Sequence, residues 1–245
     1  MTVRVRPSVI LPALIFFCCL SVSAQAVRPE QASSSKEAQS APGETETIPG
    51  EAKTAPEENT DFILLQNRSG GITITGYRGT ERSVIIPESF GGLPVTIIGS
   101  KAFYHRELSS VTIPKTVTTI EPMAFADNQL ASVEVPGAVI IGYEAFANNR
   151  LTQLSLSADL VSIGQRAFVN NRLSTVAIPG RVSNIGKDAF ADNPLRSITL
   201  GLSRNIFVSQ GFEPSFVNYY NSTGRKAGVY VKDDAVWRLQ KGDGE

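Results

Sequence analysis

Few side chains in this chain of 245 residues are equipped for chemistry, and they lie far apart. The single histidine, His105, stands between two polar or aromatic neighbours on each side, without the positioned partner that histidine catalysis normally requires. Cys18 and Cys19 are adjacent, and no cysteine follows them. These counts exclude zinc sites rich in Cys or His, iron–sulfur clusters and an internal disulfide framework.

Carboxylates are the other candidates for chemistry, because several of them converging could bind calcium. Asp127 and Asp192 are separated by whole sequence repeats, and neither they nor Asp188 have the compact spacing of a calcium loop, so we interpret them as solvated turn residues. His105 shares a polar position with Asp127 and Asp192 and has the same interpretation, with a lone general base as the alternative. We therefore predict no catalytic residue, no metal and no cofactor.

Charge and motifs narrow the classes of partner. Lys and Arg together number 23, as do Asp and Glu, so the formal net charge is zero. This balance predicts no nucleic-acid partner and no general attraction to an anionic membrane. Nucleotide-binding, zinc-protease and serine-hydrolase motifs are absent from the sequence.

Residues 1–26 have the pattern of a cleaved secretory signal peptide. Arg4 and Arg6 precede an apolar run over 9–20, and small residues follow over 21–26. The run is too short to cross a bilayer, so we expect an exported protein that is secreted, periplasmic or held at the outer cell surface.

Processing of this segment has two interpretations. Cleavage after Ala24 or Ala26 would leave a mature chain without cysteine. In the alternative, a lipid is attached at Cys18 or Cys19, as in bacterial lipoproteins, and this lipid would be the chain's link to a membrane. Residues 27–60 then lack aromatic side chains and are rich in Pro, Ser and Glu, which predicts a disordered tether.

Internal repeats carry the strongest information about architecture. The dipeptide Ala-Phe recurs every 21 or 22 residues within the unit I-G-x-x-A-F-x-x-N-x-L-x-x-V-x-I-P. Asn stands three residues after most of the Phe residues, and Leu stands five residues after each. The Phe column is Phe103, Phe125, Phe146, Phe168 and Phe190, and the Asn column is Asn128, Asn149, Asn171 and Asn193.

This period and the L-x-x-V-x-I spacing predict a leucine-rich repeat solenoid. Each repeat ends in a short strand with alternate residues inward, and equivalent strands stack into a short parallel β-sheet with about 4.8 Å between neighbours. We expect an irregular or short-helical convex side. The Phe residues form an internal spine, and the Asn side chains satisfy turn backbone, with ligand binding as the alternative role of the Asn column.

Caps must cover both ends of such a solenoid. We expect an N-terminal cap over 61–97, leucine-rich repeats over 98–212 and a C-terminal cap over 213–245. The N-terminal cap begins with a hairpin of 62–66 and 72–75, and a partial coil at 84–87 is joined to the first full repeat by a longer loop through Gly91–Gly92.

At the other end, Gly211–Phe212 follows Phe190 by one period and looks like a decayed sixth copy. Residues 215–220 predict a helical turn, and 229–231 with 236–239 predict a closing hairpin. We interpret this cap as hydrophobic closure of the last coil, since an uncapped end would expose core. The alternative is a binding surface formed by Tyr219, Tyr220, Arg225 and Lys226.

Alternation along the repeat strands also predicts which residues face outward. This surface is small, polar and nearly uncharged. Large concave solenoid surfaces typically serve macromolecular binding, which makes this face a candidate binding site. A solvated sheet without a ligand is the other interpretation, and the composition favours it slightly, because Trp, Tyr and Arg anchors are absent. The ten residues, called here the predicted face, are Ser110, Thr112, Ser132, Glu134, Gln153, Ser155, Thr175, Ala177, Ser197 and Thr199.

The repeat unit resembles the BspA-type leucine-rich repeats of secreted and surface bacterial proteins, over roughly residues 62–212. The C-terminal aromatic residues also resemble the caps of repeat proteins in host-associated spirochaetes. The resemblance implies a non-enzymatic, adhesin-like module that binds proteins, including host matrix proteins such as fibronectin and fibrinogen, or neighbouring cells. The alternative is a periplasmic structural or assembly scaffold that binds envelope proteins.

Overall fold

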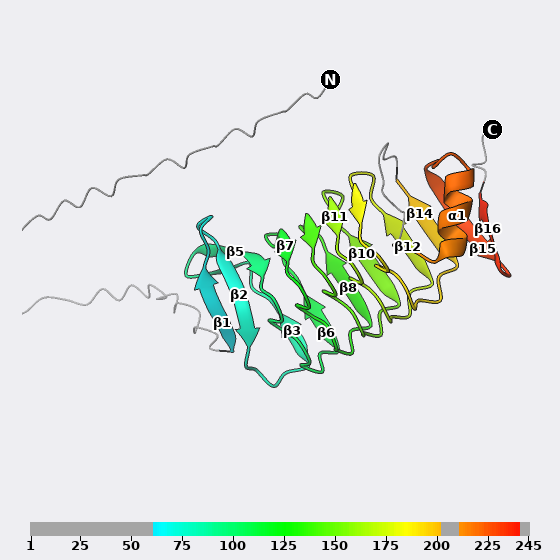
Figure 1. The fold of residues 1–245 in the computed structure, drawn as a ribbon. Helices are drawn as coiled ribbons and strands as arrows, with labels where there is room; N and C mark the ends of the chain where they lie inside the picture. Colours follow the sequence, from blue (N-terminus) through cyan, green and yellow to red (C-terminus); the bar gives the residue numbers. More distant parts are fainter. Residues whose placement is uncertain (1–60, 202–210, 241–245) are drawn as a thin grey trace, which may run out of the picture. The chain divides into compact units, whose positions relative to one another are not determined.

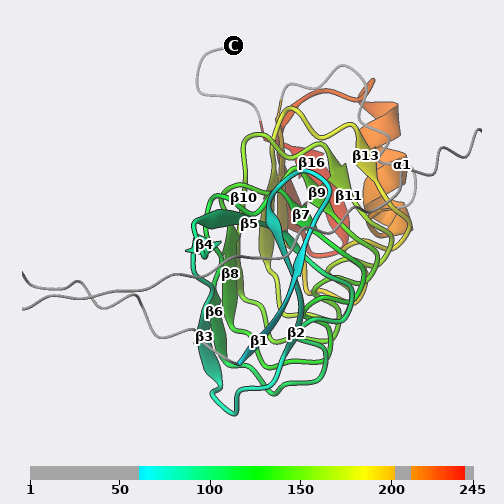
Figure 2. The ribbon, with the colours of Figure 1, turned by 90° about the vertical axis from the view of Figure 1, so that its left-hand side faces the viewer.

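The computed structural model describes residues 61–201 and 211–240, which form a solenoid of stacked coils (Figure 1). The predicted signal peptide and tether lie outside these residues. Each full coil contributes one strand to a front side and one shorter strand to a back sheet, and the hydrophobic core lies between them (Figure 2). The fold is the predicted leucine-rich repeat solenoid, with a hairpin at each end.

The back sheet runs the length of the solenoid in the order β1-β2-β5-β7-β9-β11-β13, with β4 paired to β5. From β2 to β13 neighbouring strands of this path are parallel, and most are only two residues long because turns make up the rest of this side. The strands are β1 (Phe62–Gln66), β2 (Ile72–Tyr77), β4 (Ser89–Phe90), β5 (Leu93–Ile98), β7 (Thr119–Ile120), β9 (Ile140–Ile141), β11 (Ser162–Ile163) and β13 (Asn184–Ile185).

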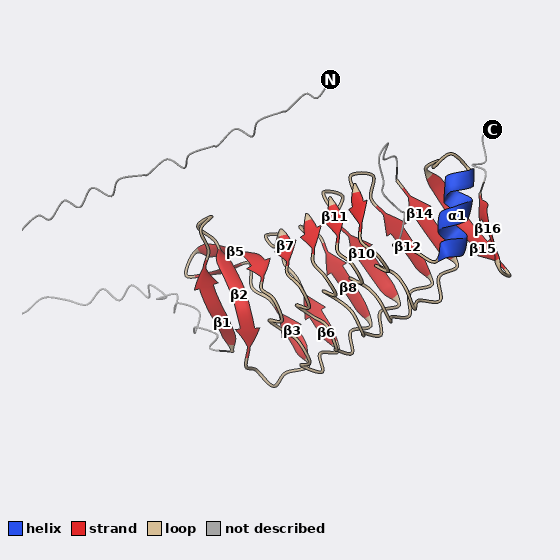
Figure 3. Ribbon diagram, viewed as in Figure 1, coloured by secondary structure: helices blue, strands red, loops and turns tan. Residues whose placement is uncertain are grey.

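The front side carries three ladders, β3-β6, β8-β10 and β12-β14-β15-β16 (Figure 3). Equivalent positions of successive repeats pair in parallel, as the repeat predicts; Thr175, for example, lies opposite Ser197. The strands are β3 (Ser83–Ile85), β6 (Ser110–Thr112), β8 (Ser132–Val135), β10 (Gln153–Leu156), β12 (Thr175–Ile178), β14 (Ser197–Leu200), β15 (Gly228–Asp233) and β16 (Val236–Leu239).

A continuous stack of phenylalanine rings forms the centre of the core. Neighbouring rings from Phe103 to Phe212 lie 5.0–5.4 Å apart between centroids, with planes within 9° of parallel. These distances are typical of favourable aromatic pairs. Phe212 extends the stack of the five predicted rings by one, so the sixth copy takes part in the core.

The Asn column connects successive coils through backbone hydrogen bonds. The Asn128 side-chain amide donates to the Phe103 carbonyl of the preceding coil at 2.8 Å and to the Phe125 carbonyl at 2.9 Å. Its Oδ1 accepts from the Leu108 backbone N–H at 3.0 Å. Asn149, Asn171 and Asn193 repeat this arrangement. Because the amides are saturated by backbone groups, their predicted structural role is confirmed.

Close approach of the coils explains the glycine at the repeat turn. A Cβ added to Gly164 would lie 2.4 Å from the backbone carbonyl carbon of Gly142 in the preceding coil. No side chain fits such a contact, and the backbone cannot move away without separating the stacked coils.

The N-terminal cap differs from the prediction in its connection to the first full repeat. Residues 88–97 were expected to form a longer loop, but β4 and β5 pair as a hairpin around Gly91–Gly92. Both glycines have positive φ, at 55° and 79°, which fits the tight turn between Phe90 and Leu93. The hairpin places Phe90 beside Phe62 and so completes the cover of the first coil.

The C-terminal cap consists of helix α1 (Pro214–Ser222) and the β15–β16 hairpin, as expected from the sequence. Phe216 on α1 contacts Phe212, the last ring of the stack, in an edge-on arrangement with centroids 5.1 Å apart. Tyr230 and Trp237 of the hairpin pack against Phe216 on its other sides. The cap thus ends the phenylalanine stack with an aromatic cluster.

Truncation of one ring of the phenylalanine stack should therefore lower the stability of the protein. We expect Phe146→Ala, in the middle of the stack, to lower the free energy of unfolding by about 3–5 kcal/mol, because it leaves a cavity between two coils. Urea unfolding followed by circular dichroism measures this loss. Tyr143→Ala, an exposed aromatic residue of the same coil, is the control and should change stability by about 0.5 kcal/mol. Equal effects of the two changes would contradict the stacking argument.

Loss of one Asn side chain should be costly for a different reason. Asn149→Ala removes the donor to three carbonyls and the acceptor for the Leu130 N–H, all in the buried turn. We expect a loss of about 1–3 kcal/mol or more, because these backbone groups have no access to water. Asn184→Ala, at an exposed position, is the control, and the urea unfolding midpoints of the two variants are compared. A midpoint for Asn149→Ala equal to that of the control would show that the ladder adds no stability.

Candidate functional site

The predicted face lies on the front side, where its residues form rows across successive strands. Eight of the ten residues are exposed, and Ser197 and Thr199 on β14 are half-buried. Alternate residues of these strands, such as Val133, Val135, Val176 and Ile178, are buried in the core. The alternation inferred from the sequence therefore correctly separates outward from inward side chains.

The closing hairpin enlarges this face beyond the repeats. Strand β15 pairs antiparallel with β14, which places Val231 opposite Ser197, and β16 then places Arg238 opposite Val231. Asp233 and Val236 form the next outward pair. The predicted face together with Val231, Asp233, Val236 and Arg238 is called here the extended face.

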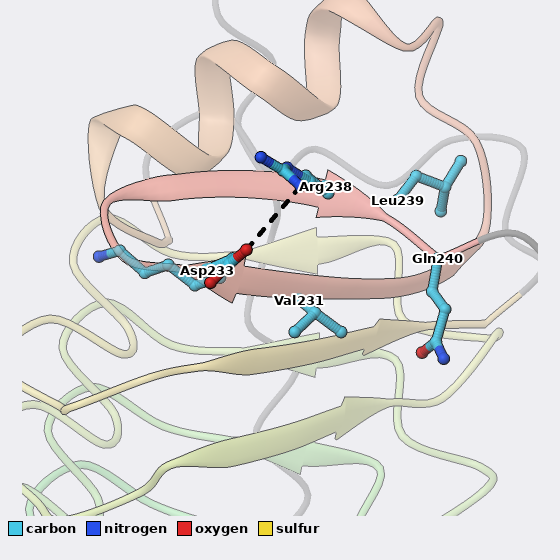
Figure 4. Close-up of a pocket in the computed structure, with 6 residues that line it drawn as sticks. Val231, Asp233, Arg238, Leu239 and Gln240 are labelled. Atoms are coloured by element: carbon cyan, nitrogen blue, oxygen red, sulfur yellow. Dashed lines mark ion pairs between the residues drawn. The ribbon is translucent and has the colours of Figure 1, made fainter.

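Two hollows lie on the C-terminal part of the extended face. One, of about 490 Å³, is lined from β10, β12 and β14, with Gln153, Thr175, Ala177 and Thr199 among its residues. The second, of about 450 Å³, lies over the β15–β16 hairpin (Figure 4). Because Ser197 of the first hollow is the strand partner of Val231 of the second, the two hollows adjoin.

The chemistry of the extended face is that of hydrogen bonding and small apolar contacts. Glu134 is the one charged residue among the ten of the predicted face. The hairpin adds an ion pair between Arg238 and Asp233, with nitrogen and oxygen 3.8 Å apart and both side chains well exposed (Figure 4). An exposed pair of this kind contributes little to stability, so both groups are available to a partner.

Within residues 61–201 and 211–240, no three His, Cys, Asp or Glu side chains gather as a metal site would require. His105, Asp127 and Asp192 occupy the equivalent turn in three of the coils, each with φ between 53° and 57°. Short polar residues tolerate this left-handed conformation, which accounts for the polar column. The Asp127 carboxylate accepts a hydrogen bond from Asn148 of the next coil at 2.6 Å.

The aromatic residues considered for binding on the C-terminal cap serve closure instead. Tyr220 is only 2% exposed, so the interpretation of it as a surface residue is wrong. The Tyr219 hydroxyl accepts a hydrogen bond from the Leu239 backbone N–H at 3.0 Å, which ties α1 to β16. Burial raises the pKa of Tyr220, which favours its neutral form. Arg225 and Lys226 remain exposed beside the helix.

Glu213, just before α1, connects the helix to the hairpin. Its carboxylate accepts hydrogen bonds from Lys232 Nζ at 2.8 Å, from Ser215 Oγ at 2.7 Å and from the Trp237 indole N–H. Desolvation acts to raise the pKa of Glu213, but these hydrogen bonds and the charge of Lys232 outweigh it and lower the pKa below its ordinary value. The hairpin part of the extended face therefore depends on an ionised Glu213.

This coupling predicts an acid-sensitive cap. Since the pKa of Glu213 is lower in the folded state, its contribution is complete above the ordinary value of 4.5 and is lost as pH falls through the folded value. Fluorescence of Trp237, the single Trp of the chain, reports unfolding of the cap. Glu213→Gln should be less stable at pH 7 and lose less stability between pH 5 and pH 3. Parallel pH profiles for the variant and wild type would exclude Glu213 as the responsible group.

Four members of the extended face were not predicted from the sequence, namely Val231, Asp233, Val236 and Arg238. The hairpin itself was predicted, but not its pairing with the last repeat strand. The period-2 pattern in 229–233, with Tyr230 inward between Val229 and Val231, was the available indication. Burial of Tyr230 confirms that pattern, but the antiparallel attachment depends on tertiary contacts.

The fold and its repeated front strands define the class of this protein as a leucine-rich repeat solenoid. Residues 96–216 match the BspA-type leucine-rich repeat region in six copies. The repeat region therefore belongs to the BspA-type leucine-rich repeats. This family suggests a protein-binding role.

Solved structures of bacterial leucine-rich repeat proteins are similar to this chain. A Treponema pallidum leucine-rich repeat protein is 22% identical, with a TM-score of 0.42 and coverage of 57% of this chain and 69% of that protein. A leucine-rich cell surface protein of Faecalibacterium prausnitzii is 22% identical, with a TM-score of 0.41 and coverage of 74% of this chain and 59% of that protein. The pneumococcal vaccine antigen PcpA is 17% identical, with a TM-score of 0.47 and coverage of 75% of this chain and 53% of that protein. The chain thus spans less than two thirds of the last two proteins.

No curated protein sequence matches the chain significantly. In the part of the chain that the structure describes, no helix has the length and apolar character needed to cross a membrane.

Proposed function

We propose that this chain is an exported, non-enzymatic protein-binding module, which contacts host matrix proteins or other cells through the extended face. The observation that carries the proposal is the outward surface of the front strands, on which the ladder β12-β14-β15-β16 joins the last repeats to the closing hairpin and two adjoining hollows lie at the C-terminal part. Its rows of hydroxyl and amide groups suit hydrogen bonding to a polypeptide. Membership of the BspA-type repeats supports a location outside the cell or on its surface.

The composition of the extended face indicates where binding would be strongest. Binding energy at protein interfaces concentrates in aromatic and Arg residues, while small polar residues mostly contribute complementarity. The repeats offer the small polar residues, and the hairpin offers Arg238, which lies opposite Val231 and forms the ion pair with Asp233. We therefore assign the anchor of the interface to the hairpin and its lateral contacts to the repeats.

Filling the first hollow should block binding. Ala177→Arg places a long charged side chain between the β10 and β14 rows, and we expect the dissociation constant for immobilised fibronectin or fibrinogen to rise by about tenfold or more. Biolayer interferometry of the purified protein measures this change. Gln165→Arg, an exposed position on a back-sheet turn, is the matched control and should bind like wild type. Absence of micromolar binding by the wild type to either matrix protein or to cells would contradict the adhesin-like function.

The cellular location of the protein is tested by a separate experiment. Protease added to intact cells should degrade the repeat region while a periplasmic marker survives, if the chain is displayed outside the cell. Protection of the repeats until the envelope is lysed would instead support the alternative, a periplasmic scaffold that binds envelope proteins. Crosslinking in intact cells would then identify its partners.

A further inference from the structure

The front side is interrupted between β10 and β12, although these strands belong to successive coils (Figure 1). Strand β10 pairs with β8 and β12 pairs with β14, but no backbone hydrogen bond joins β10 to β12 within the described residues. The two coils are still joined just before the strands, where the Arg172 backbone N–H donates to the Leu151 carbonyl at 2.9 Å. The backbone groups with which β10 and β12 face each other are therefore left unpaired in this part of the chain.

The interruption opens the core to the first hollow. Leu154 occupies an inward position on β10 but is only half-buried, whereas the equivalent Val133 and Val176 are 2% and 4% exposed. Both Leu154 and Val176 line the first hollow, together with outward residues of β10, β12 and β14. The hollow therefore reaches between the two strands and offers apolar side chains as well as unpaired backbone groups.

The coils around this hollow carry positive charge. Each of the three has one exposed Arg shortly before its strand, and residues 150–156, 172–178 and 194–200 contain no other charged residue. None of these three side chains, nor the nearby Asp192, forms an ion pair within the described residues, where four other arginines do. The three are Arg150, Arg172 and Arg196.

A second interruption, between β6 and β8, provides a comparison within the same molecule. It also leaves an inward residue, Val111, half-buried. The equivalent stretches there, 107–113 and 129–135, have Glu107 and Glu134 as their charged residues. Of the two interruptions, the one between β10 and β12 is therefore the one that suits a negatively charged partner.

We propose that the first hollow binds a segment of a partner polypeptide in which an apolar side chain is flanked by Asp or Glu. The apolar side chain enters between β10 and β12 and contacts Leu154 and Val176. The backbone of the segment hydrogen-bonds with the unpaired groups of the two strands. This inference rests on the proposed protein-binding function and adds the chemistry of the partner.

The carboxylates of the segment bind the arginines. The planar guanidinium of Arg can donate two parallel hydrogen bonds to one carboxylate, which makes Arg well suited to this recognition. Arg150 lies two residues before Thr152, and Arg196 directly precedes Ser197; both Thr152 and Ser197 line the hollow, so the long Arg side chains can reach its rim. A sulfated polysaccharide could bind the arginines but has no side chain for the apolar floor, so the combination favours a polypeptide.

Fluorescence anisotropy of the labelled peptide Glu-Glu-Leu-Glu-Glu tests this site on the protein purified in the form that its cells produce. The wild type should bind the peptide saturably. The double variant Arg150→Gln, Arg172→Gln should raise the dissociation constant by about tenfold or more, because charge-assisted hydrogen bonds are lost. Arg181→Gln is the matched control, since it removes the same charge from an exposed ion pair with Asp159, and it should bind like wild type. Circular dichroism should show all variants folded.

Two further probes test the apolar part of the site. The peptide Glu-Glu-Ser-Glu-Glu should bind about tenfold more weakly than the leucine peptide, because it has no apolar side chain to bury. Heparin tests the sulfated polysaccharide. Equal binding of the two peptides, binding of heparin without the leucine peptide, or unchanged affinity of the double variant would each overturn the proposal, as would a wild type that binds no peptide up to its solubility limit.

Competition separates this inference from the proposed function. The leucine peptide should displace the protein from immobilised fibronectin or fibrinogen. Matrix binding that neither the peptide nor the double Arg variant weakens would overturn the inference and leave the proposed function intact. Peptide binding by a protein that binds neither matrix protein nor cells would support the inference and contradict the adhesin-like function.

Discussion

The structure depends on one constraint: a single coil of about 22 residues can neither bury its own apolar side chains nor satisfy its own turn backbone. Both deficits are met by the neighbouring coil. The phenylalanine stack covers apolar surface from coil to coil, and each Asn side chain joins backbone groups of two coils. Stability therefore depends on contacts between coils, and so an uncovered end would expose core and unpaired backbone.

This constraint also determines where function can be located. Inward positions are committed to the core, the Asn amides to the backbone, and the glycines to close contact between coils. Outward positions of the front strands have none of these structural roles, so their side chains can be adapted to a partner. Such outward positions here include those of the cap, because β15 and β16 continue the last repeat ladder and add Arg238 to an otherwise weakly charged surface.

The repeated part could be predicted from sequence because each column is sampled several times. Agreement among five Phe positions identifies a core column, and the same alignment identifies Ser155 and Thr175 as outward. The caps occur once each, so local pattern is the only guide there. The hairpin at Gly91–Gly92 was not predicted, although two adjacent glycines are a known signal for such a turn. Burial of Tyr220 and the attachment of β15 to β14 depend on how the helix and hairpin close the last coil, which local pattern does not specify.

The two ends meet the same requirement by different physical means. At the C-terminus an aromatic cluster covers the last ring, and the ionised Glu213 joins α1 to the hairpin. At the N-terminus Phe62, Tyr77 and Phe90 cover the first ring, but the edge of β1 stays apolar.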